Sequence, residues 1–291
     1  MEGVVKVCDC LDELRKLPDK CVDLVFCSPP YEAARTYGIG FKLRGQGWVD
    51  WAVERFVECQ RVSRGLVAWV VEGQTRKFQW SATPALLMAD LHRAGVKLRK
   101  PPVFHRVGIP GSGGPDWWRN NYEFCVCSSH GKLPWSDNTA TGHAPKWGPG
   151  GEMSHRLPDG ARVNQWGRVG GKRGAGNVSP DGEQMRVQCY TPPVKANPGN
   201  VIKCNVGGGR MGSKLAEENE APFPEKLAEA FIKCFCPPGG VVLDPFCGSG
   251  TTLAVADRLG REWIGYDVRQ SQVDLSLRRI AESREKHKEA V

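Results

Sequence analysis

Several features are absent from the 291-residue sequence, and each absence excludes a class of protein. No apolar run approaches the roughly 20 residues that a membrane-spanning helix needs, so we expect no membrane partner. The 12 cysteines include no Cys-x-x-Cys pair, which argues against a zinc site, and we expect no metal. No Gly-Lys-Thr follows a glycine turn, so the chain lacks a phosphate loop of the nucleotidase kind.

The cysteines predict a reducing environment instead of disulfides. Several are two residues apart, as Cys125 and Cys127 are, which places both on one face of a strand. There Cys serves as a small buried apolar residue. The chain is not short, and no secretory signal is visible before Val4. We therefore expect a cytoplasmic protein.

The positive charge is concentrated in one segment. The net charge is +8, and residues 131–215 hold 12 Lys and Arg against 5 Asp and Glu. Such an excess indicates a polyanionic partner that this segment contacts. A solvated basic loop is the alternative interpretation, and charge by itself does not separate the two.

Residues 241–252 read Val-Val-Leu-Asp-Pro-Phe-Cys-Gly-Ser-Gly-Thr-Thr, and the rest of the chain is organised around them. The first three form a short apolar run, typical of a strand buried on both faces. Gly248 and Gly250 form a turn with little bulk, and Thr251 or Thr252 is expected to cap the following helix, over 253–259. This geometry brings backbone N–H groups close to a ligand. The next strand ends in Asp267, where such folds hold a ribose hydroxyl pair.

A second motif, Ser28-Pro29-Pro30-Tyr31, follows the apolar run of residues 22–27. Two prolines cannot continue a strand ladder, so the chain turns rigidly there. A lone Pro-Pro pair is usually a simple strand-ending turn, and a glycine turn alone is an equally weak signal. The combination of the two motifs is the informative observation.

Together the motifs resemble those of S-adenosylmethionine-dependent DNA amino-methyltransferases. Their catalytic tetrapeptide is Asp/Asn/Ser-Pro-Pro-Tyr/Phe/Trp, and their cofactor loop resembles the run from Asp244 to Thr252. The catalytic motif comes first here, as in the β arrangement of the family, and the resemblance covers most of the chain outside roughly residues 131–214. It implies S-adenosylmethionine as cofactor. It also implies the catalytic residues Ser28, Pro29, Pro30 and Tyr31.

The resemblance further implies a set of cofactor-binding residues. In the family an acidic residue after the first strand lies near the cofactor's adenine, and Asp9 matches it, although Cys8 replaces the usual Gly. A Phe-Pro pair flanks the methionine end, whereas Glu220 stands where His is usual and is left out. The expected cofactor-binding residues are Asp9, Phe223, Pro224, Asp244, Pro245, Phe246, Gly248, Ser249, Gly250, Thr251 and Asp267.

The predicted fold is α/β, a doubly wound Rossmann-like methyltransferase sheet that is circularly permuted. Its seven strands are expected at residues 4–7, 22–27, 65–71, 96–106, 122–127, 241–243 and 262–266. Asp9, Ser28, Asp244 and Asp267 all fall at carboxyl ends of these strands. Because ligands bind at that edge of such sheets, the four side chains should converge on one crevice, whatever the family.

Three parts are expected along the chain: a catalytic half over 1–130, an irregular target-recognition insert over 131–215, and a cofactor-binding half over 216–291. Periodicity disappears in the insert, but Trp135, Trp147 and Trp166 argue against a disordered linker. In the family this divergent segment reads the sequence of double-stranded DNA. The residues expected to contact DNA are Arg156, Arg162, Arg168, Lys172 and Arg173.

The expected reaction is site-specific methylation of the exocyclic amine of a flipped base that stacks on Tyr31. Hydrogen bonds to Ser28 Oγ and to the Pro29 carbonyl would favour a pyramidal, nucleophilic nitrogen. Ser28 favours cytosine N4, because Asp is more usual at this position in adenine enzymes. N6-adenine methylation is the alternative, followed by RNA methylation and by a non-catalytic nucleic-acid binder.

Two further expectations come from the family. Cytosine-C5 chemistry requires a Pro-Cys thiolate, and the sequence contains no Pro-Cys dipeptide. A cognate restriction endonuclease is a possible partner, and a prokaryotic or phage origin fits the family.

Overall fold

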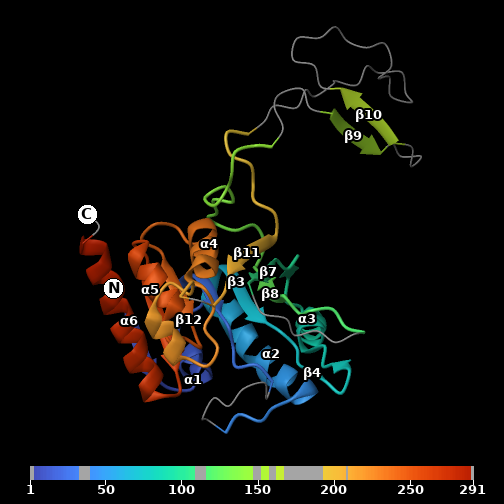
Figure 1. Ribbon diagram of the computed structural model, residues 1–291. Helices are drawn as coiled ribbons and strands as arrows, with labels where there is room; N and C mark the ends of the chain where they lie inside the picture. Colours follow the sequence, from blue (N-terminus) through green and yellow to red (C-terminus); the bar gives the residue numbers. More distant parts are fainter. Residues whose placement is uncertain are drawn as a thin grey trace. The chain divides into compact units, whose positions relative to one another are not determined.

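The computed structural model describes residues 3–32, 40–108, 116–146, 152–156, 162–166, 193–207 and 209–289 (Figure 1). The chain divides into two compact units. One comprises residues 1–140 and 199–291, and the other comprises residues 141–198. None of the helices in the described ranges combines the length and apolar character that a membrane crossing requires.

The larger unit is built on a mixed, mostly parallel sheet with the strand order β1-β13-β12-β2-β3-β8-β7-β11, and β6 pairs with β8. From β1 to β3 all neighbours are parallel. β8 is antiparallel to β3 and β7, and β11 is parallel to β7. The strands are β1 (Val4–Val7), β2 (Val22–Cys27), β3 (Ser63–Val71), β6 (Leu98–Arg99), β7 (Val103–Val107), β8 (Tyr122–Ser128), β11 (Val201–Asn205), β12 (Val241–Asp244) and β13 (Glu262–Asp267).

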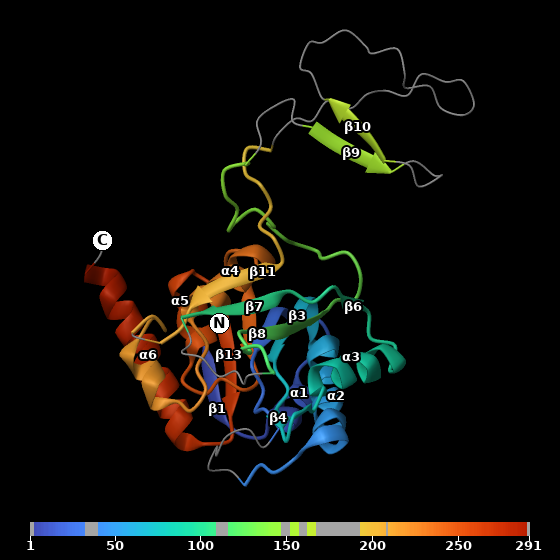
Figure 2. The same cartoon turned by 45° about the vertical axis from the view of Figure 1, so that its right-hand side comes forward.

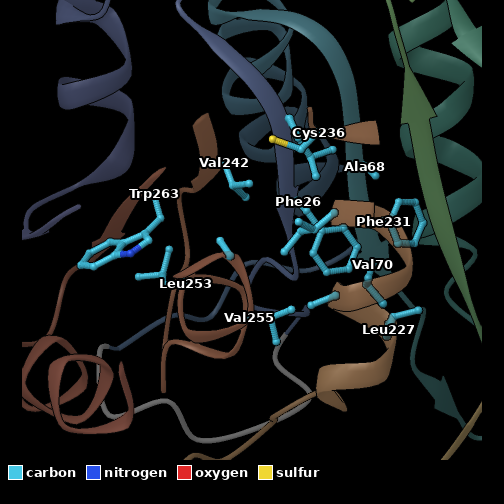
Figure 3. Packing of buried hydrophobic residues seen from close by; sticks show 14 of the residues in the cluster. Phe26, Ala68, Val70, Leu227, Phe231, Cys236, Val242, Leu253, Val255 and Trp263 are labelled. Atoms are coloured by element: carbon cyan, nitrogen blue, oxygen red, sulfur yellow. The ribbon is translucent and has the colours of Figure 1, made fainter. Parts of the chain in front are cut away.

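Helices cover both faces of this sheet (Figure 2). Alternate residues of β3 enter different cores: Ala68 and Val70 pack with Phe231 of α4 (Figure 3), whereas Val67 and Trp69 join the cluster with α1, α2 and α3. Burial on both faces explains the continuous apolar runs of the central strands. The helices are α1 (Cys10–Lys16), α2 (Gly45–Val62), α3 (Thr83–Arg93), η1 (Lys214–Glu218), α4 (Glu225–Phe235), α5 (Thr251–Arg258) and α6 (Gln270–Glu289).

Two strand predictions needed correction. The single strand expected over 96–106 is divided into β6 and β7, because Pro101 and Pro102 lack the N–H groups that a continuous ladder needs. β11 was not predicted. It lies within the stretch 131–215 that the sequence assigned to the insert, yet it pairs with β7 in the main sheet.

The prediction that Thr251 or Thr252 caps α5 is wrong. The N-cap is Gly250, at φ +75°, and no side chain caps the helix. Thr251 is already inside the helix, and the Thr252 hydroxyl donates to the Phe26 carbonyl of β2 at 3.4 Å. A positive φ suits glycine, so the sharp turn after β12 determines which residue begins the helix.

Two hairpins complete the described elements. β4 (Thr75–Arg76) and β5 (Gln79–Trp80) form a short hairpin between β3 and α3. In the smaller unit, β9 (Glu152–Arg156) and β10 (Arg162–Trp166) form an antiparallel pair in which Arg162 lies opposite Arg156. The sequence showed no periodicity there, and no strand was expected. Predicted DNA contacts Arg168, Lys172 and Arg173 lie outside the described residues.

Candidate active site

The carboxyl ends of four neighbouring parallel strands, β1, β13, β12 and β2, meet at one edge of the sheet beside a cavity of about 480 Å³. Small-molecule sites are typically roughly 300–1,000 Å³. The predicted residues that line this cavity are Asp9, Ser28, Pro29, Pro30, Phe223, Pro245, Phe246, Gly248, Ser249, Thr251 and Asp267. Four predicted residues do not line it: Tyr31, Pro224, Asp244 and Gly250.

Asp267 joins the glycine turn to the end of β13. Its Oδ2 accepts from Gly248 N–H at 3.1 Å, and its Oδ1 accepts from Arg269 N–H at 2.9 Å. Burial raises the pKa of Asp267, although these donors oppose the shift. A carboxylate offers about four acceptor directions, and Arg269 Nε also lies 3.6 Å from Oδ1, so Oδ2 is the oxygen best able to accept a further hydroxyl. Arg269 also pairs with Glu220, the residue that the sequence left out, at 2.7 Å.

The predicted cofactor loop after β12 is held by contacts from α6. At Gly250 a Cβ would lie 2.8 Å from Ser276 Cα, so this glycine permits close packing against α6 and does not line the cavity. The Ser276 hydroxyl donates to the Gly248 carbonyl at 2.7 Å. The buried Arg279 guanidinium donates to Thr251 Oγ1 at 2.7 Å and to Ser249 Oγ at 3.2 Å. These contacts fix the loop that the cavity exposes.

Arg279 was missed by the sequence analysis. It is 1% exposed, and its charge is balanced by Glu225 of α4, whose Oε1 lies 3.0 Å from Nη2. Desolvation lowers the pKa of Arg279, which the pair with Glu225 opposes. No local signal identified it, because an arginine on a polar terminal helix is ordinarily exposed.

Asp244 is fully buried at the end of β12 and does not line the cavity. Its Oδ1 accepts from Phe246 N–H at 3.0 Å. Desolvation raises the pKa of Asp244 to about 7, and the hydrogen bond from Phe246 N–H only partly opposes this shift. A carboxyl group with such a pKa changes its charge near neutral pH.

Asp9 is both the N-cap of α1 and part of the cavity wall. It accepts from Leu11 N–H at 2.9 Å and forms a two-oxygen contact with Arg55 Nη2 of α2, at 3.2 and 3.0 Å. Arg55 also stacks over the Trp51 ring, 4.6 Å from its centroid. Trp51 and Arg55 line the cavity, and Trp51 packs against Phe246 with ring centroids 5.7 Å apart. The sequence had placed the α2 aromatics in the core, which is right for Trp48 but incomplete for Trp51.

The predicted catalytic tetrapeptide, Ser28 to Tyr31, turns away from β2 and is held by hydrogen bonds from neighbouring elements. Trp48 Nε1 donates to the Pro30 carbonyl at 2.8 Å. The Ser28 hydroxyl lies 3.2 Å from the Val70 carbonyl of β3 and 3.3 Å from the Tyr31 hydroxyl. Tyr31 in turn donates to Glu123 Oε2 of β8 at 2.6 Å. Because the Tyr31 proton is given to Glu123, its oxygen is left to accept from Ser28.

Two acidic residues beside the tetrapeptide were also missed. Glu123 is 8% exposed and pairs with Arg106 of β7 at 3.1 Å. Glu72 directly follows β3, and burial raises its pKa, with the Glu123 charge adding to the shift. Glu72 is an acidic residue at the carboxyl end of a strand, so the reasoning that identified Asp9 would have identified it too.

The cysteines near the site are unsuited to nucleophilic chemistry. Cys27, immediately before Ser28, is fully buried, and desolvation raises the pKa of its thiol well above the ordinary value. Cys247 lines the cavity, and burial raises its pKa in the same way. A thiol that stays protonated is a poor nucleophile. Among the described residues no group of three His, Cys, Asp or Glu is arranged to hold a metal ion.

The chain is similar to known DNA methyltransferases. A family model described as DNA methylase matches residues 22–278. The DNA adenine methyltransferase YhdJ of Escherichia coli (strain K12) is 26% identical over 277 residues, which cover 94% of this chain and 80% of that protein.

Two solved structures share the fold. The PvuII cytosine-N4-specific DNA methyltransferase superposes with a TM-score of 0.65 at 19% identity, over 96% of this chain and 86% of that one. The protein TTHA0409 of Thermus thermophilus, complexed with S-adenosyl-L-methionine, superposes with a TM-score of 0.58 at 20% identity, over 96% and 95% of the two chains.

Proposed function

The chain belongs to the DNA methylase family, and from that premise we propose that it methylates N4 of a cytosine flipped out of double-stranded DNA. The enzyme is a DNA amino-methyltransferase, and the choice between cytosine N4 and adenine N6 is the part we propose. The observation that carries the proposal is the hydroxyl of Ser28, which lies at the wall of the cavity where the family places its amine-binding group.

S-adenosylmethionine is the cofactor. The cavity suits it, since it offers the Asp267 oxygens for a ribose, the aromatic rings of Trp51 and Phe246 for an adenine, and Phe223 for the methionine end. Asp9 and Arg55 form an ion pair on the same wall, so their charges balance there. When bound, the cofactor supplies a methyl group on a positively charged sulfur.

The hydrogen-bond chain beside Ser28 prepares this residue to accept from an amine. Ser28 has one proton, and it can give this proton to Val70 O or to the Tyr31 hydroxyl. Either choice leaves oxygen lone pairs free to accept an N–H of the target base. When Ser28 donates to Tyr31, the Glu123 carboxylate polarises this chain and makes the Ser28 oxygen a stronger acceptor. The neutral Ser28 thereby gains some of the electrostatic effect that an Asp has directly.

This chain of contacts adds a second role for Tyr31. Its ring is proposed to stack on the flipped base, and its hydroxyl connects Ser28 to Glu123. Tyr31→Phe keeps the ring and removes the connection, so it should slow turnover without weakening DNA binding. Tyr31→Ala should do both, because stacking contributes roughly 1–3 kcal/mol per base.

We also propose that the smaller unit and its flanking basic residues contact the DNA. The charge excess over residues 131–215 supports this role, as does the β9–β10 hairpin that carries Arg156 and Arg162. A two-stranded ribbon fits a major groove. A cognate restriction endonuclease remains a prediction from the family.

Nucleoside analysis tests the proposal directly. Plasmid DNA incubated with the protein and S-adenosylmethionine is digested to nucleosides and examined by mass spectrometry, and we expect N4-methylcytosine. Ser28→Ala should lower turnover about 10²-fold, near 2.7 kcal/mol, with unchanged cofactor affinity. N6-methyladenine as the product would overturn the choice of base but not the site. Unmodified DNA from a protein that binds the cofactor would overturn DNA methylation.

A further inference from the structure

The hairpin of β4 and β5 has an unusual turn. Its two central residues, Lys77 and Phe78, both have positive φ, of 47° and 63°. Two-residue hairpin turns of this kind normally use Asn-Gly or Asp-Gly, because Cβ crowds a backbone carbonyl oxygen at positive φ and only Gly, Asn and Asp tolerate this readily. The chain therefore places a bulky aromatic residue where glycine would be favoured.

Among the described residues of the larger unit, Phe78 is the most exposed large apolar side chain apart from Trp118. It is 86% exposed, and all six residues from Thr75 to Trp80 are exposed. A phenylalanine is ordinarily buried. Arg76 and Lys77 beside it are cationic, so the tip combines an apolar ring with positive charge.

The base of the hairpin is held rigidly beside the catalytic segment. Trp80 Nε1 donates to Glu72 Oε1 at 3.0 Å, and Gln74 N–H donates to Glu32 Oε1 at 3.2 Å. Glu32 follows Tyr31 directly, and its other oxygen accepts from Gly45 N–H at the start of α2. Both views show β4 near the start of α2 (Figures 1 and 2). The hairpin therefore extends from the sheet edge that carries the cavity.

We propose that Phe78 is a wedge that enters the base stack of duplex DNA next to the target base. The inference rests on the proposed function, since the target amine must leave the stack to reach Ser28. Apolar side chains inserted between base steps are a known means of unstacking a duplex. Lys77 and Arg76 would meet the phosphates on either side of the inserted ring. The strained turn holds the ring outward, where its exposed surface is accessible to DNA.

Three substitutions at this hairpin tip separate a wedge from a structural role. Phe78→Gly removes the ring and relieves the strained turn, so the protein should melt at or above the wild-type temperature. Phe78→Leu keeps an apolar wedge, and Lys77→Ala removes a neighbouring charge with the ring in place. Cofactor affinity should be unchanged in all three, because the hairpin does not line the cavity.

The wild-type protein first modifies a plasmid, and sequencing then locates a methylated site. Two duplex substrates are built around that site. In one the target base is paired, and in the other it is mismatched and leaves the stack more easily. Phe78→Gly should slow single-turnover methylation at least about tenfold on the paired duplex and less than about threefold on the mismatched one. Phe78→Leu should stay near the wild-type rate on both.

Any of the following results would overturn the wedge proposal. Wild-type rates for Phe78→Gly on the paired duplex exclude a wedge. An equal loss on both duplexes means that Phe78 contacts DNA or the protein in another way, and lowered melting means that its role is structural. A wild-type protein that modifies no DNA would overturn the proposed function itself, which is distinguishable because the wild-type reaction is then absent.

Discussion

The raised pKa of Asp244, the buried residue at the end of β12, can be tested by the pH dependence of protein stability. The carboxyl group is 1% exposed, and burial raises its pKa to about 7 from an ordinary 3.8. Asp244→Asn keeps an oxygen that can accept from Phe246 N–H and removes the titration. The comparison of the two proteins therefore isolates the pH dependence that this one group causes.

The direction in which the free energy of unfolding changes with pH follows from proton binding. Between about pH 4 and pH 7 the folded protein keeps the Asp244 proton and the unfolded chain does not, so unfolding releases a proton. The free energy of unfolding therefore falls as pH rises, and the favourable contribution is present below the unfolded pKa and lost as pH passes about 7. One pKa unit corresponds to about 1.4 kcal/mol, so the full shift is worth about 4 kcal/mol.

The assay is urea unfolding of the cofactor-free proteins at several pH values. Relative to Asp244→Asn, the wild-type protein should lose about 3 kcal/mol between pH 5 and pH 8, mostly below pH 7. Asp23→Asn is the control. Burial raises the pKa of Asp23, but Arg64 and the Val241 N–H outweigh burial and hold it below the ordinary value, so its effect should be constant over this range. A constant difference between wild type and Asp244→Asn would refute the reasoning.

Three further predictions concern binding. Arg279→Met should weaken S-adenosylmethionine binding about tenfold by calorimetry, because it removes the hydrogen bonds that hold Thr251 and Ser249. Arg258→Met is the control: it breaks another ion pair to the same Glu225 and should leave cofactor affinity within about twofold. Equal losses would contradict a loop-positioning role. Asp267→Ala should cost about 1.5–3 kcal/mol of cofactor affinity, and wild-type affinity would exclude the ribose contact. Replacing Lys172 and Arg173 by Ala should reduce the salt dependence of DNA binding by roughly 0.9 in slope for each lost phosphate contact, and an unchanged slope would count against such contacts.

The sequence by itself determined the elements whose signals are local. The limits of β1 and β2 agree with the prediction, because each is a short apolar run, and Pro29 and Pro30 cannot extend β2. The convergence of Asp9, Ser28 and Asp267 was equally predictable, since parallel strands direct their carboxyl ends to one edge. The circular permutation, the three-part division of the chain and the roles of the site residues stay predictions.

Only the tertiary structure decided which side chains support the site. Arg55 reaches Asp9 across 46 positions, and Tyr31 reaches Glu123 across 92. Arg279 becomes a buried support of the cofactor loop only because α6 packs against Gly250. Strand β11 likewise exists through its pairing with β7. Each of these contacts depends on the packing of segments far apart in the chain. A local residue pattern therefore does not predict them.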